Sequence, residues 1–316
     1  MTYRFRCYRG GDEEQIINLW NRCLTRDPVT REKFRRKILL DENFDPRGCH
    51  VAESGKHVVG VCLALRRRFP YYGLGLEAEK GWITLLFVHP DHRRRGIASG
   101  LLDRSEQFLK KNAVRDVLVS PYTPNYIIPG VDVDAYADAH RLLRARGYKG
   151  TEKVYSMGRS LLDFRLSEEM TERCASLEAQ GISIKPFQSH YTVPLLDFLG
   201  RDYPGDLFRT ALECLRAAPN CDEILIAVKE EEVVGFSHFE QEHFGPFAVA
   251  PSLGGRGIGT CLYYRTAAHM KERGHRNLWL AWTTGHAKDF YHKMGLKTLR
   301  RHEIMSKSLS EDRSAQ

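Results

Sequence analysis

An internal repeat constrains the fold of this 316-residue chain more than any other feature of its sequence. Residues 88–98 read VHPDHRRRGIA and, 161 positions later, residues 249–259 read VAPSLGGRGIG, so that Val, Pro, Arg, Gly and Ile recur at identical spacing. Solenoid repeats have periods of roughly 20–50 residues, so a period this long indicates a duplicated domain. The length also suits two domains of roughly 150 residues each.

The same order of elements is predicted in both halves from the alternation and helical spacing of apolar residues. Each half should hold a strand, two helices, a hairpin of two strands, a fourth strand that runs into the repeated segment, a long helix, a fifth strand, another helix and a final strand pair. In the first half the ranges are 3–8, 13–24, 30–40, 49–54, 57–65, 82–88, 96–111, 114–120 and 136–146, and in the second half they are 182–187, 192–199, 206–217, 223–229, 233–239, 244–249, 257–273, 277–282 and 287–294. We place the two domains at residues 1–162 and 178–316.

The first half also carries an insertion. The repeat offset narrows from 161 to 148 between the repeated segment and the Gly147/Gly295 pair, which leaves 13 extra residues in the first half. They belong to residues 121–132, whose prolines and glycine predict an irregular loop. Such a loop is either a wall of a substrate site or a solvated surface insertion.

Composition narrows the class of protein. The longest apolar stretches are strand-sized, far below the roughly 18–20 residues of a membrane helix, and the N-terminus has no signal-peptide pattern. We therefore expect a soluble, cytoplasmic protein without a membrane partner. The eight cysteines are scattered without a Cys-x-x-Cys pair, so we expect no zinc site, no other metal, no disulfide framework, and mostly reduced thiols.

The net charge of +8 is unevenly distributed along the chain. Residues 1–160 carry +10 and the remaining residues carry −2. A basic half suggests a polyanionic partner, either nucleic acid or a phosphorylated cofactor. The basic residues of 31–37 lie all around the predicted helix instead of along one face, so a nucleic-acid-binding stripe is poorly formed and no nucleic-acid partner is expected.

The repeated segment has the features of a phosphate-binding turn. A strand ends in Val-x-Pro, a basic or glycine-rich loop follows, and Gly-x-Ala or Gly-x-Gly begins a helix. The first N–H groups of a helix lack partners and lie at the positive end of its dipole. Glycine lets this backbone approach phosphate oxygens, and arginines add charge-assisted hydrogen bonds. Neither a dinucleotide-binding Gly-x-Gly-x-x-Gly after a first strand nor a P-loop Gly-Lys-Ser/Thr is present.

The motif and the order of elements resemble those of the GNAT superfamily, the acetyl-coenzyme A dependent N-acyltransferases. The family signature Gln/Arg-x-x-Gly-x-Gly/Ala is matched fully by residues 93–98, whereas the second copy, residues 254–259, has Gly254 at the first position. The resemblance implies a fold of α/β (α+β) class. It consists of two tandem domains, each with a mixed, mostly antiparallel sheet, flanking helices and splayed fourth and fifth strands.

The resemblance also implies acetyl-CoA as co-substrate, with pantetheine along the fourth strand and pyrophosphate on the turn. The expected cofactor-binding residues are Leu86, Phe87, Val88, Arg93, Arg94, Arg95, Gly96, Ile97 and Ala98 in the first half, and Phe247, Ala248, Val249, Gly255, Arg256, Gly257, Ile258 and Gly259 in the second.

The family's catalytic pattern, Ala-x-x-Phe-Tyr before a Gly-Phe-like pair, is matched by residues 287–296 and places Tyr291 as proton donor to the departing thiolate. Leu143 occupies that position in the first half. We therefore predict that the second half is catalytic and that the first half binds coenzyme A or shapes the site. Glu240 is the candidate general base, and Glu242, His238 and His243 are nearby alternatives.

The resulting interpretation is an acyltransferase that acts on an amine of a small molecule or peptide, with the acceptor and the oligomeric state left open. Two alternatives remain. The chain could be an acetyl-CoA-binding sensor or scaffold with a degenerate catalytic site, which would bind the thioester without turnover. It could instead bind nucleic acid through its basic half, which would make binding steeply salt-dependent.

Overall fold

The chain packs as two compact units in the computed structural model, which describes residues 2–218 and 221–309. Among the described residues, unit 1 consists of 2–70, 75–154 and 300–309, and unit 2 consists of 71–74, 155–218 and 221–299. The outer limits of the two predicted domains, residue 1 and residues 310–316, lie outside the described residues.

Unit 1 is built on a mixed sheet in the order β1-β2-β3-β4-β5-β13, in which β4 and β5 are parallel and the other neighbours are antiparallel. Its elements are β1 (Arg4–Cys7), α1 (Glu13–Cys23), α2 (Arg31–Phe34), the π-helical turn η1 (Arg35–Leu39), η2 (Pro46–Gly48), β2 (Cys49–Ser54), β3 (His57–Arg66), β4 (Lys80–Val88), η3 (Pro90–His92), α3 (Ile97–Lys111), β5 (Asp116–Val119), β6 (Val131–Asp132), α4 (Ala137–Ala145), the first part of β7 (Lys149–Ser160) and most of β13 (Lys297–Ser308).

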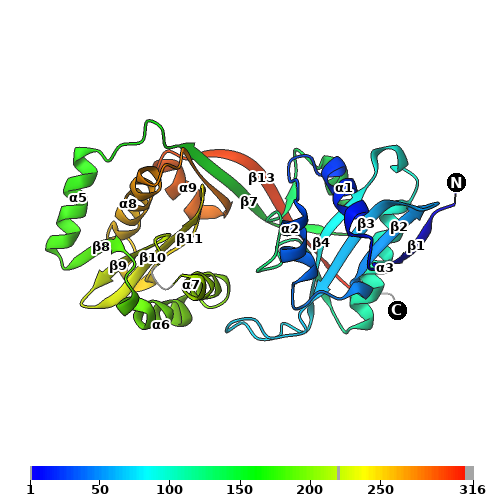
Figure 1. The fold of residues 1–316 in the computed structure, drawn as a ribbon, viewed down its shortest axis with the longest axis horizontal. Helices are drawn as coiled ribbons and strands as arrows, with labels where there is room; N and C mark the ends of the chain where they lie inside the picture. The colour runs from blue at the N-terminus through cyan, green and yellow to red at the C-terminus, as the bar shows by residue number, and fades with distance from the viewer. Residues whose placement is uncertain (1, 219–220, 310–316) are drawn as a thin grey trace, which may run out of the picture. The chain divides into compact units, whose positions relative to one another are not determined.

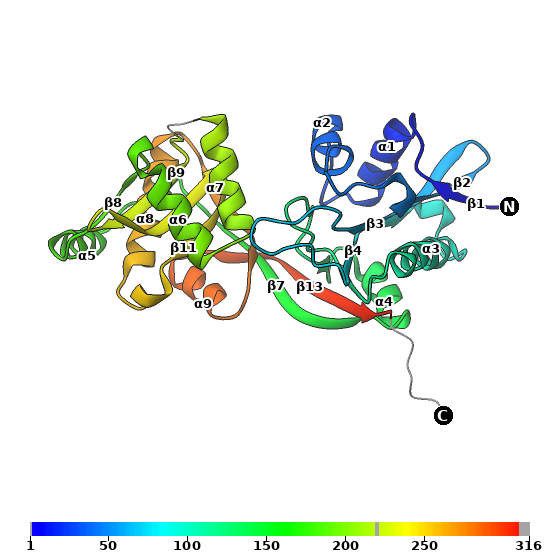
Figure 2. The same cartoon turned by 90° about the horizontal axis from the view of Figure 1, so that it is seen from below.

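Helices cover both faces of this sheet (Figure 2). Strand β3 alternates, with Val59 and Cys62 in a core beneath α3, and Val61 and Leu63 in a second core beneath α1 and α2. Trp20, which is fully buried, lies in the second core together with Trp82. Continuous apolar runs in the central strands follow from this burial on two faces.

Unit 2 repeats the plan in the order β8-β9-β10-β11-β12-β7, with β11 and β12 parallel. Its elements are α5 (Glu168–Ala179), β8 (Ile182–Pro186), η4 (Ser189–Tyr191), α6 (Thr192–Asp202), α7 (Asp206–Ala217), β9 (Ile224–Lys229), β10 (Glu232–Glu240), β11 (His243–Val249), η5 (Pro251–Leu253), α8 (Ile258–Glu272), β12 (Asn277–Thr283) and α9 (Gly285–Lys293). The predicted fold class, two mixed and mostly antiparallel sheets with flanking helices, is confirmed.

The last strand of each half contributes to both units (Figure 1, β7 green and β13 red). Strand β7 belongs to unit 1 up to Val154, and its residues 155–160 then pair with β12 of unit 2. Strand β13 enters unit 1 at Arg300, and its residues 305–308 pair with β5. The sheet of each unit thus ends in a strand segment that comes from the other half of the sequence. The periodicity of apolar residues does not reveal this pairing.

The insertion in the first half is an ordered loop. Tyr122 is fully buried and its hydroxyl group donates to Asp41 Oδ1 (2.9 Å) and accepts from Asn43 Nδ2 (2.9 Å). The buried Arg67 guanidinium donates to the carbonyl oxygen of Thr123 (3.1 Å). Residues 131–132 form the short strand β6 on β13, although we expected no regular structure there.

Two buried histidines should make the stability of unit 1 depend on pH. Burial lowers the pKa of His50 to about 4 and that of His302 to about 4. Both side chains therefore take up protons more readily when unfolded, where the pKa is about 6.5. Stability should then be complete above pH 6.5 and fall towards pH 4, by about 2 kcal/mol per histidine between pH 7 and 5.

Urea unfolding at pH 7 and 5 measures this effect. The variants His50→Gln and His302→Gln should each lose part of the pH dependence, whereas replacement of the exposed His57 should not change it. An unaltered pH dependence in both buried variants would contradict the prediction.

Candidate active site

The fourth and fifth strands of unit 1 separate halfway along β4. Parallel pairing runs from Lys80 opposite Asp116 to Ile83 opposite Val119. Thr84 is an extra residue in β4, because Leu63 pairs with Leu85 and Ala64 pairs with Ile83. This bulge bends β4 at the point of separation. The predicted contact residues Leu86, Phe87 and Val88 lie beyond the last pair with β5, as the splayed arrangement requires.

The turn after β4 has the same backbone conformation in both copies. Arg94 and Gly96 have φ values of +60° and +79°, and their counterparts Gly255 and Gly257 have +79° and +85°. These left-handed residues turn successive N–H groups towards one side, which produces an anion-binding concavity at the helix N-terminus. Around Gly96 this concavity is open, since an added Cβ would meet no atom within 4 Å.

A cavity of about 1080 Å³ occupies the opening in unit 1. Its lining includes the three β4 residues named above, Thr84, the end of β5, the turn with the first residues of α3, and α4. The insertion contributes Ile127, Ile128 and Val131, so this loop is a wall of the cavity. The predicted residues Arg93, Arg94, Gly96, Ile97 and Ala98 all line it. Arg95 instead donates to the hydroxyl group of Tyr3 (3.1 Å).

The cavity lining carries charges of both signs. Arg22, Arg93 and Arg94 belong to it, and Arg94 pairs with Asp138 of α4 (3.1 Å). Burial raises the pKa of the Cys23 thiol in this lining, and nearby Arg93 partly opposes the change. Asp27 and Tyr136 also line the cavity, although the sequence did not point to either residue. No family motif marks these residues, and the arginine that binds Asp27, Arg300, follows 273 residues later.

The residues of unit 1 fit coenzyme A. The cavity is lined by an open phosphate-binding turn with arginines and by the part of β4 beyond its last pair with β5. The Thr84 hydroxyl group is buried beside the bulge and makes no hydrogen bond to any described residue. It is therefore a polar group available to a ligand in the cavity.

The corresponding region of unit 2 is filled by aromatic rings. Tyr291, on α9, is 9% exposed and packs edge-on against Phe244, Tyr263 and Phe290. Burial raises the pKa of its phenol above the ordinary value. The predicted pantetheine-contacting residue Phe247 belongs to the same cluster, with its ring stacked on that of Phe290. Ala248 is buried next to it, and Val249 accepts a hydrogen bond from Tyr203 (2.6 Å).

The turn of unit 2 is also more covered than that of unit 1. A Cβ added to Gly257 would lie 2.9 Å from Nε of Arg173, a residue of α5. A Cβ on Gly259 would contact Val249 and Phe247. Gly255, Arg256, Gly257, Ile258 and Gly259 thus keep the conformation of a phosphate-binding turn, but a cationic side chain lies over its centre.

The candidate bases of the second half lie at the β10–β11 hairpin. Glu240 is exposed and pairs through its backbone with His243. This end of β11 is where the strand is still paired with β12, through His243 and Trp279. The Glu242 carboxylate accepts from the backbone N–H groups of Arg276 (3.1 Å) and Asn277 (3.0 Å). These contacts support a hairpin-stabilising role for Glu242.

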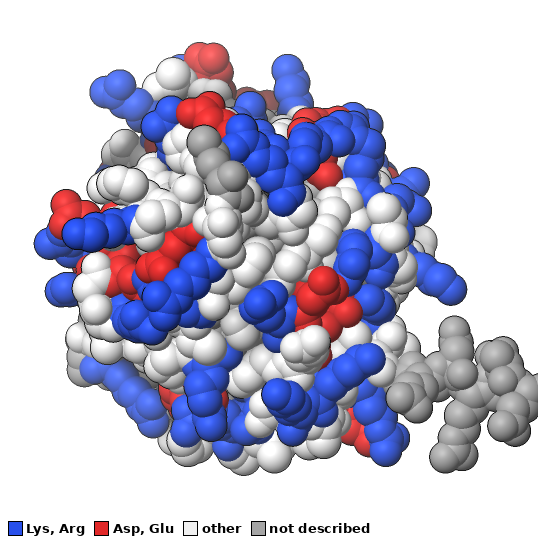
Figure 3. Space-filling model, turned by 90° about the vertical axis from the view of Figure 1, so that its right-hand side faces the viewer, with Lys and Arg blue, Asp and Glu red and all other residues white. Residues whose placement is uncertain are grey.

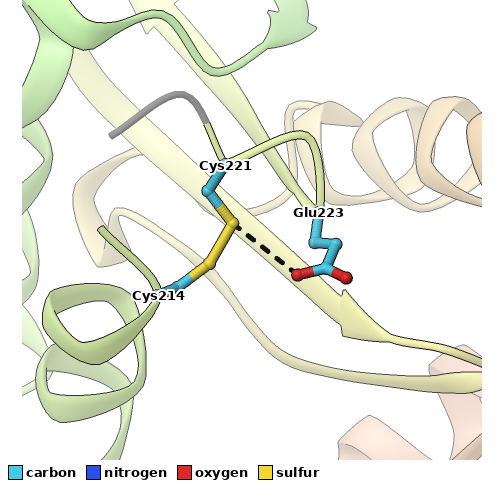
Figure 4. A group of neighbouring side chains, drawn as sticks. All are labelled: Cys214, Cys221 and Glu223. Carbon is cyan, nitrogen blue, oxygen red and sulfur yellow. Dashed lines mark hydrogen bonds between the residues drawn. A yellow bond between two sulfur atoms is a disulfide. The ribbon is translucent and has the colours of Figure 1, made fainter. Parts of the chain in front are cut away.

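One disulfide connects Cys214 at the end of α7 to Cys221, whose sulfur lies 3.8 Å from Oε2 of Glu223 (Figure 4). We expected no disulfide framework, and the structure has this single bridge. Six other cysteines are free. Among the described residues, one group has its potential ligand atoms close enough together to hold a metal ion, and it consists of Cys214, Cys221 and Glu223. With both sulfurs in the bridge, this group offers only the carboxylate as an ordinary metal ligand.

The surface of unit 1 carries mixed charges. On the face in Figure 3, Lys and Arg side chains are interspersed with Asp, Glu and uncharged residues and form no continuous stripe. Residues 2–218 and 221–309 contain no helix that is long and apolar enough to cross a membrane.

Two copies of one α/β unit, each with a parallel strand pair that opens before a phosphate-binding type of turn, define the class of this protein. The chain belongs to the acetyltransferase (GNAT) family, whose model matches residues 13–126 and 192–296. The resemblance to this family that the repeated motif indicated is therefore confirmed.

Known relatives agree with this assignment. "Acetyltransferase SG1711" of Sodalis glossinidius is 29% identical over 160 residues, 50% of this chain and 95% of the relative. "Acetyltransferase plu1384" of Photorhabdus laumondii is 30% identical over 139 residues, 43% of this chain and 87% of the relative. Both matches cover about one half of the duplicated chain.

Solved structures share the fold of the whole chain. A GCN5-related N-acetyltransferase from Sphaerobacter thermophilus has a TM-score of 0.71 and 17% identity over 98% of this chain and 96% of its own. A tandem GNAT protein of the clavulanic acid biosynthesis pathway has a TM-score of 0.66 and 15% identity over 98% and 100%. A GCN5-related glucosamine N-acetyltransferase region of a fungal GH3 β-N-acetylglucosaminidase has a TM-score of 0.79 and 17% identity over 97% of this chain and 38% of that one.

Proposed function

We propose that the protein is an N-acetyltransferase that transfers an acetyl group from acetyl-CoA to an amine of a small molecule or peptide, and that unit 1 contains the site. The observation that carries this proposal is the 1080 Å³ cavity of unit 1, which joins the phosphate-binding turn to the unpaired edge of β4. In this arrangement the turn binds the pyrophosphate, Leu86, Phe87 and Val88 align the pantetheine, and the far end of the cavity receives the amine.

The assignment to unit 1 reverses our sequence-based preference for the second half. That preference rested on Tyr291, whose ring lies among aromatic side chains.

A cytoplasmic location stays a prediction.

Release of free thiol from acetyl-CoA in the presence of different amines tests the function. The panel should include amino sugars, since one neighbour is described as a glucosamine N-acetyltransferase region, together with polyamines and peptides with free N-termini or lysines. Amine-dependent thiol release supports an acetyltransferase. Tight binding of coenzyme A without turnover on any amine would favour the alternative, an acetyl-CoA-binding sensor or scaffold.

Substitution of Tyr291 separates the two units. If unit 1 catalyses transfer, Tyr291→Phe should leave kcat within about 3-fold of the wild type, since the ring still fills the aromatic cluster. A loss of roughly 100-fold, the range expected for a removed general acid, would restore Tyr291 as proton donor and place catalysis in unit 2. The measurement is the thiol-release rate at saturating acetyl-CoA and amine.

A further inference from the structure

Unit 1 needs a proton donor that the family motif does not supply. Leu143 stands where the second half has Tyr291, and its side chain is buried in the core beneath α3. The hydroxyl-bearing residues that line the cavity include Thr25, Thr84, Ser99, Ser120 and Tyr136. The Ser120 hydroxyl group is engaged with the carbonyl oxygen of Ile128. An aliphatic hydroxyl group such as that of Thr84 is also a much weaker acid than a phenol.

Tyr136 is held at the cavity by a chain of charged contacts. Its hydroxyl group donates to Asp27 Oδ2 (2.5 Å). Arg300 binds the same carboxylate with both terminal nitrogens, Nη1 to Oδ1 (2.5 Å) and Nη2 to Oδ2 (2.8 Å). Its Nε donates to Asp132 Oδ2 (2.7 Å), and Asp132 in turn accepts from the backbone N–H of Ala135 (2.8 Å).

These contacts determine both the place and the protonation of the phenol. The side chains of Asp27, Asp132 and Arg300 are 10%, 4% and 17% exposed, so the network is largely shielded from water. Two carboxylates and one guanidinium leave a net charge of −1. Burial and the charge of Asp27 raise the pKa of Tyr136, so the phenol keeps its proton at neutral pH. A bidentate arginine fixes the orientation of the carboxylate that holds the phenol.

We propose that Tyr136 is the catalytic acid of unit 1 and that Asp27, oriented by Arg300, is its positioning residue. This inference rests on the proposed acetyltransferase function of the unit 1 cavity. The amine first forms the new carbon–nitrogen bond, and the carbon–sulfur bond then breaks. In that second step the phenolic O–H of Tyr136 turns from Asp27 to the sulfur and gives it the proton, while the phenolic oxygen takes the proton that the amine nitrogen loses, so that no phenolate forms beside the Asp27 carboxylate. Since Arg300 lies on β13, a residue of the second half of the sequence orients the acid of the first unit.

The test compares Tyr136→Phe with Tyr148→Phe. Tyr148 is a matched control, because its buried hydroxyl group also donates to a carboxylate, Glu106 Oε1 (3.0 Å), and Tyr148 does not line the cavity. Tyr136→Phe should lower kcat about 100-fold and leave the KM for acetyl-CoA and the calorimetric affinity for coenzyme A within about 3-fold. Tyr148→Phe should keep kcat within about 3-fold even where it lowers the unfolding midpoint.

Asp27→Asn is the second variant, because asparagine keeps an acceptor oxygen for the phenol. It should lower kcat about 10-fold with little change in coenzyme A affinity, and it informs the proposal if Tyr136→Phe does not fold. An unchanged kcat in Tyr136→Phe overturns this inference, and if only Asp27→Asn folds, an unchanged kcat in that variant does so. In either case turnover by the wild type leaves the proposed function intact. Absence of turnover in the wild type on the whole amine panel overturns both.

Discussion

Replacement of Gly96 by aspartate should weaken coenzyme A binding by about 100-fold or more. A carboxylate at this position lies in the open concavity where the turn meets α3, so it repels phosphate and competes for the same N–H groups. Loss of two hydrogen bonds to a charged group costs about 3 kcal/mol, which corresponds to roughly 100-fold in affinity. Aspartate is among the residues that tolerate the left-handed conformation of Gly96, and it is a good helix N-cap, so the fold should be preserved.

Gly257→Asp is the matched control in unit 2. The two glycines have nearly the same φ, +79° and +85°, so the two substitutions should impose similar backbone strain. At Gly257 the end of the Arg173 side chain must also shift, because it lies 2.9 Å from the added Cβ. If only unit 1 binds coenzyme A, Gly257→Asp should leave the calorimetric affinity within about 3-fold of the wild type. The opposite ranking of the two variants would place the cofactor in unit 2 and refute the assignment of the site to unit 1.

Replacement of Arg300 by alanine should strongly destabilise unit 1. The side chain neutralises Asp27 and Asp132, which are 10% and 4% exposed. Removing one partner from a buried ion pair leaves an uncompensated charge and typically costs about 3–5 kcal/mol. We expect a decrease of this size in the free energy of unfolding of unit 1. Urea unfolding followed by the fluorescence of Trp20 and Trp82, in a Trp279→Phe, Trp282→Phe background, reports on unit 1.

Arg301→Ala provides the adjacent control. Arg301 also contacts an aspartate, Asp134 (2.7 Å), but the two side chains are 61% and 57% exposed. Exposed pairs contribute about 0–1 kcal/mol, so this variant should unfold close to the wild type. Equal destabilisation by the two substitutions would show that Arg300 contributes through its place on β13 and not through the buried carboxylates.

Much of the fold could be predicted from the sequence because the repeat and the periodicity are local signals. The predicted helix 206–217 has the bounds of α7, and the other elements with predicted ranges agree within a few residues, since apolar spacing reports which face is buried. The predicted final strand pair of each half is instead one long strand, β7 or β13. The predicted second helix of the first half, 30–40, passes after Phe34 into a π-helical turn. The partners of β7 and β13 escaped prediction, because strand pairing over more than 100 residues leaves no local pattern.

The residues of the candidate site likewise divide into those that the sequence predicted and those that it did not. The turn at residues 93–98 and the strand edge at Leu86 to Val88 were identified because their chemistry depends on consecutive backbone groups. Asp27, Tyr136 and Arg300 were missed, because each is an ordinary polar residue until the fold brings the three together. Tyr291 fits a family pattern by sequence, but the aromatic residues that surround its ring come from two other elements of unit 2, β11 and α8, as well as from α9.

The shared strands β7 and β13 have a consequence for how the chain can be divided. A cut at the sequence midpoint would leave the first fragment with an unsatisfied edge on β5 and without Arg300, and it would give the second fragment a last strand that lacks its partner. Two such fragments should be poorly soluble alone and should recover structure when they are mixed. In topology the two units have exchanged their terminal strands within one polypeptide, so neither unit can complete its sheet without the other half of the sequence.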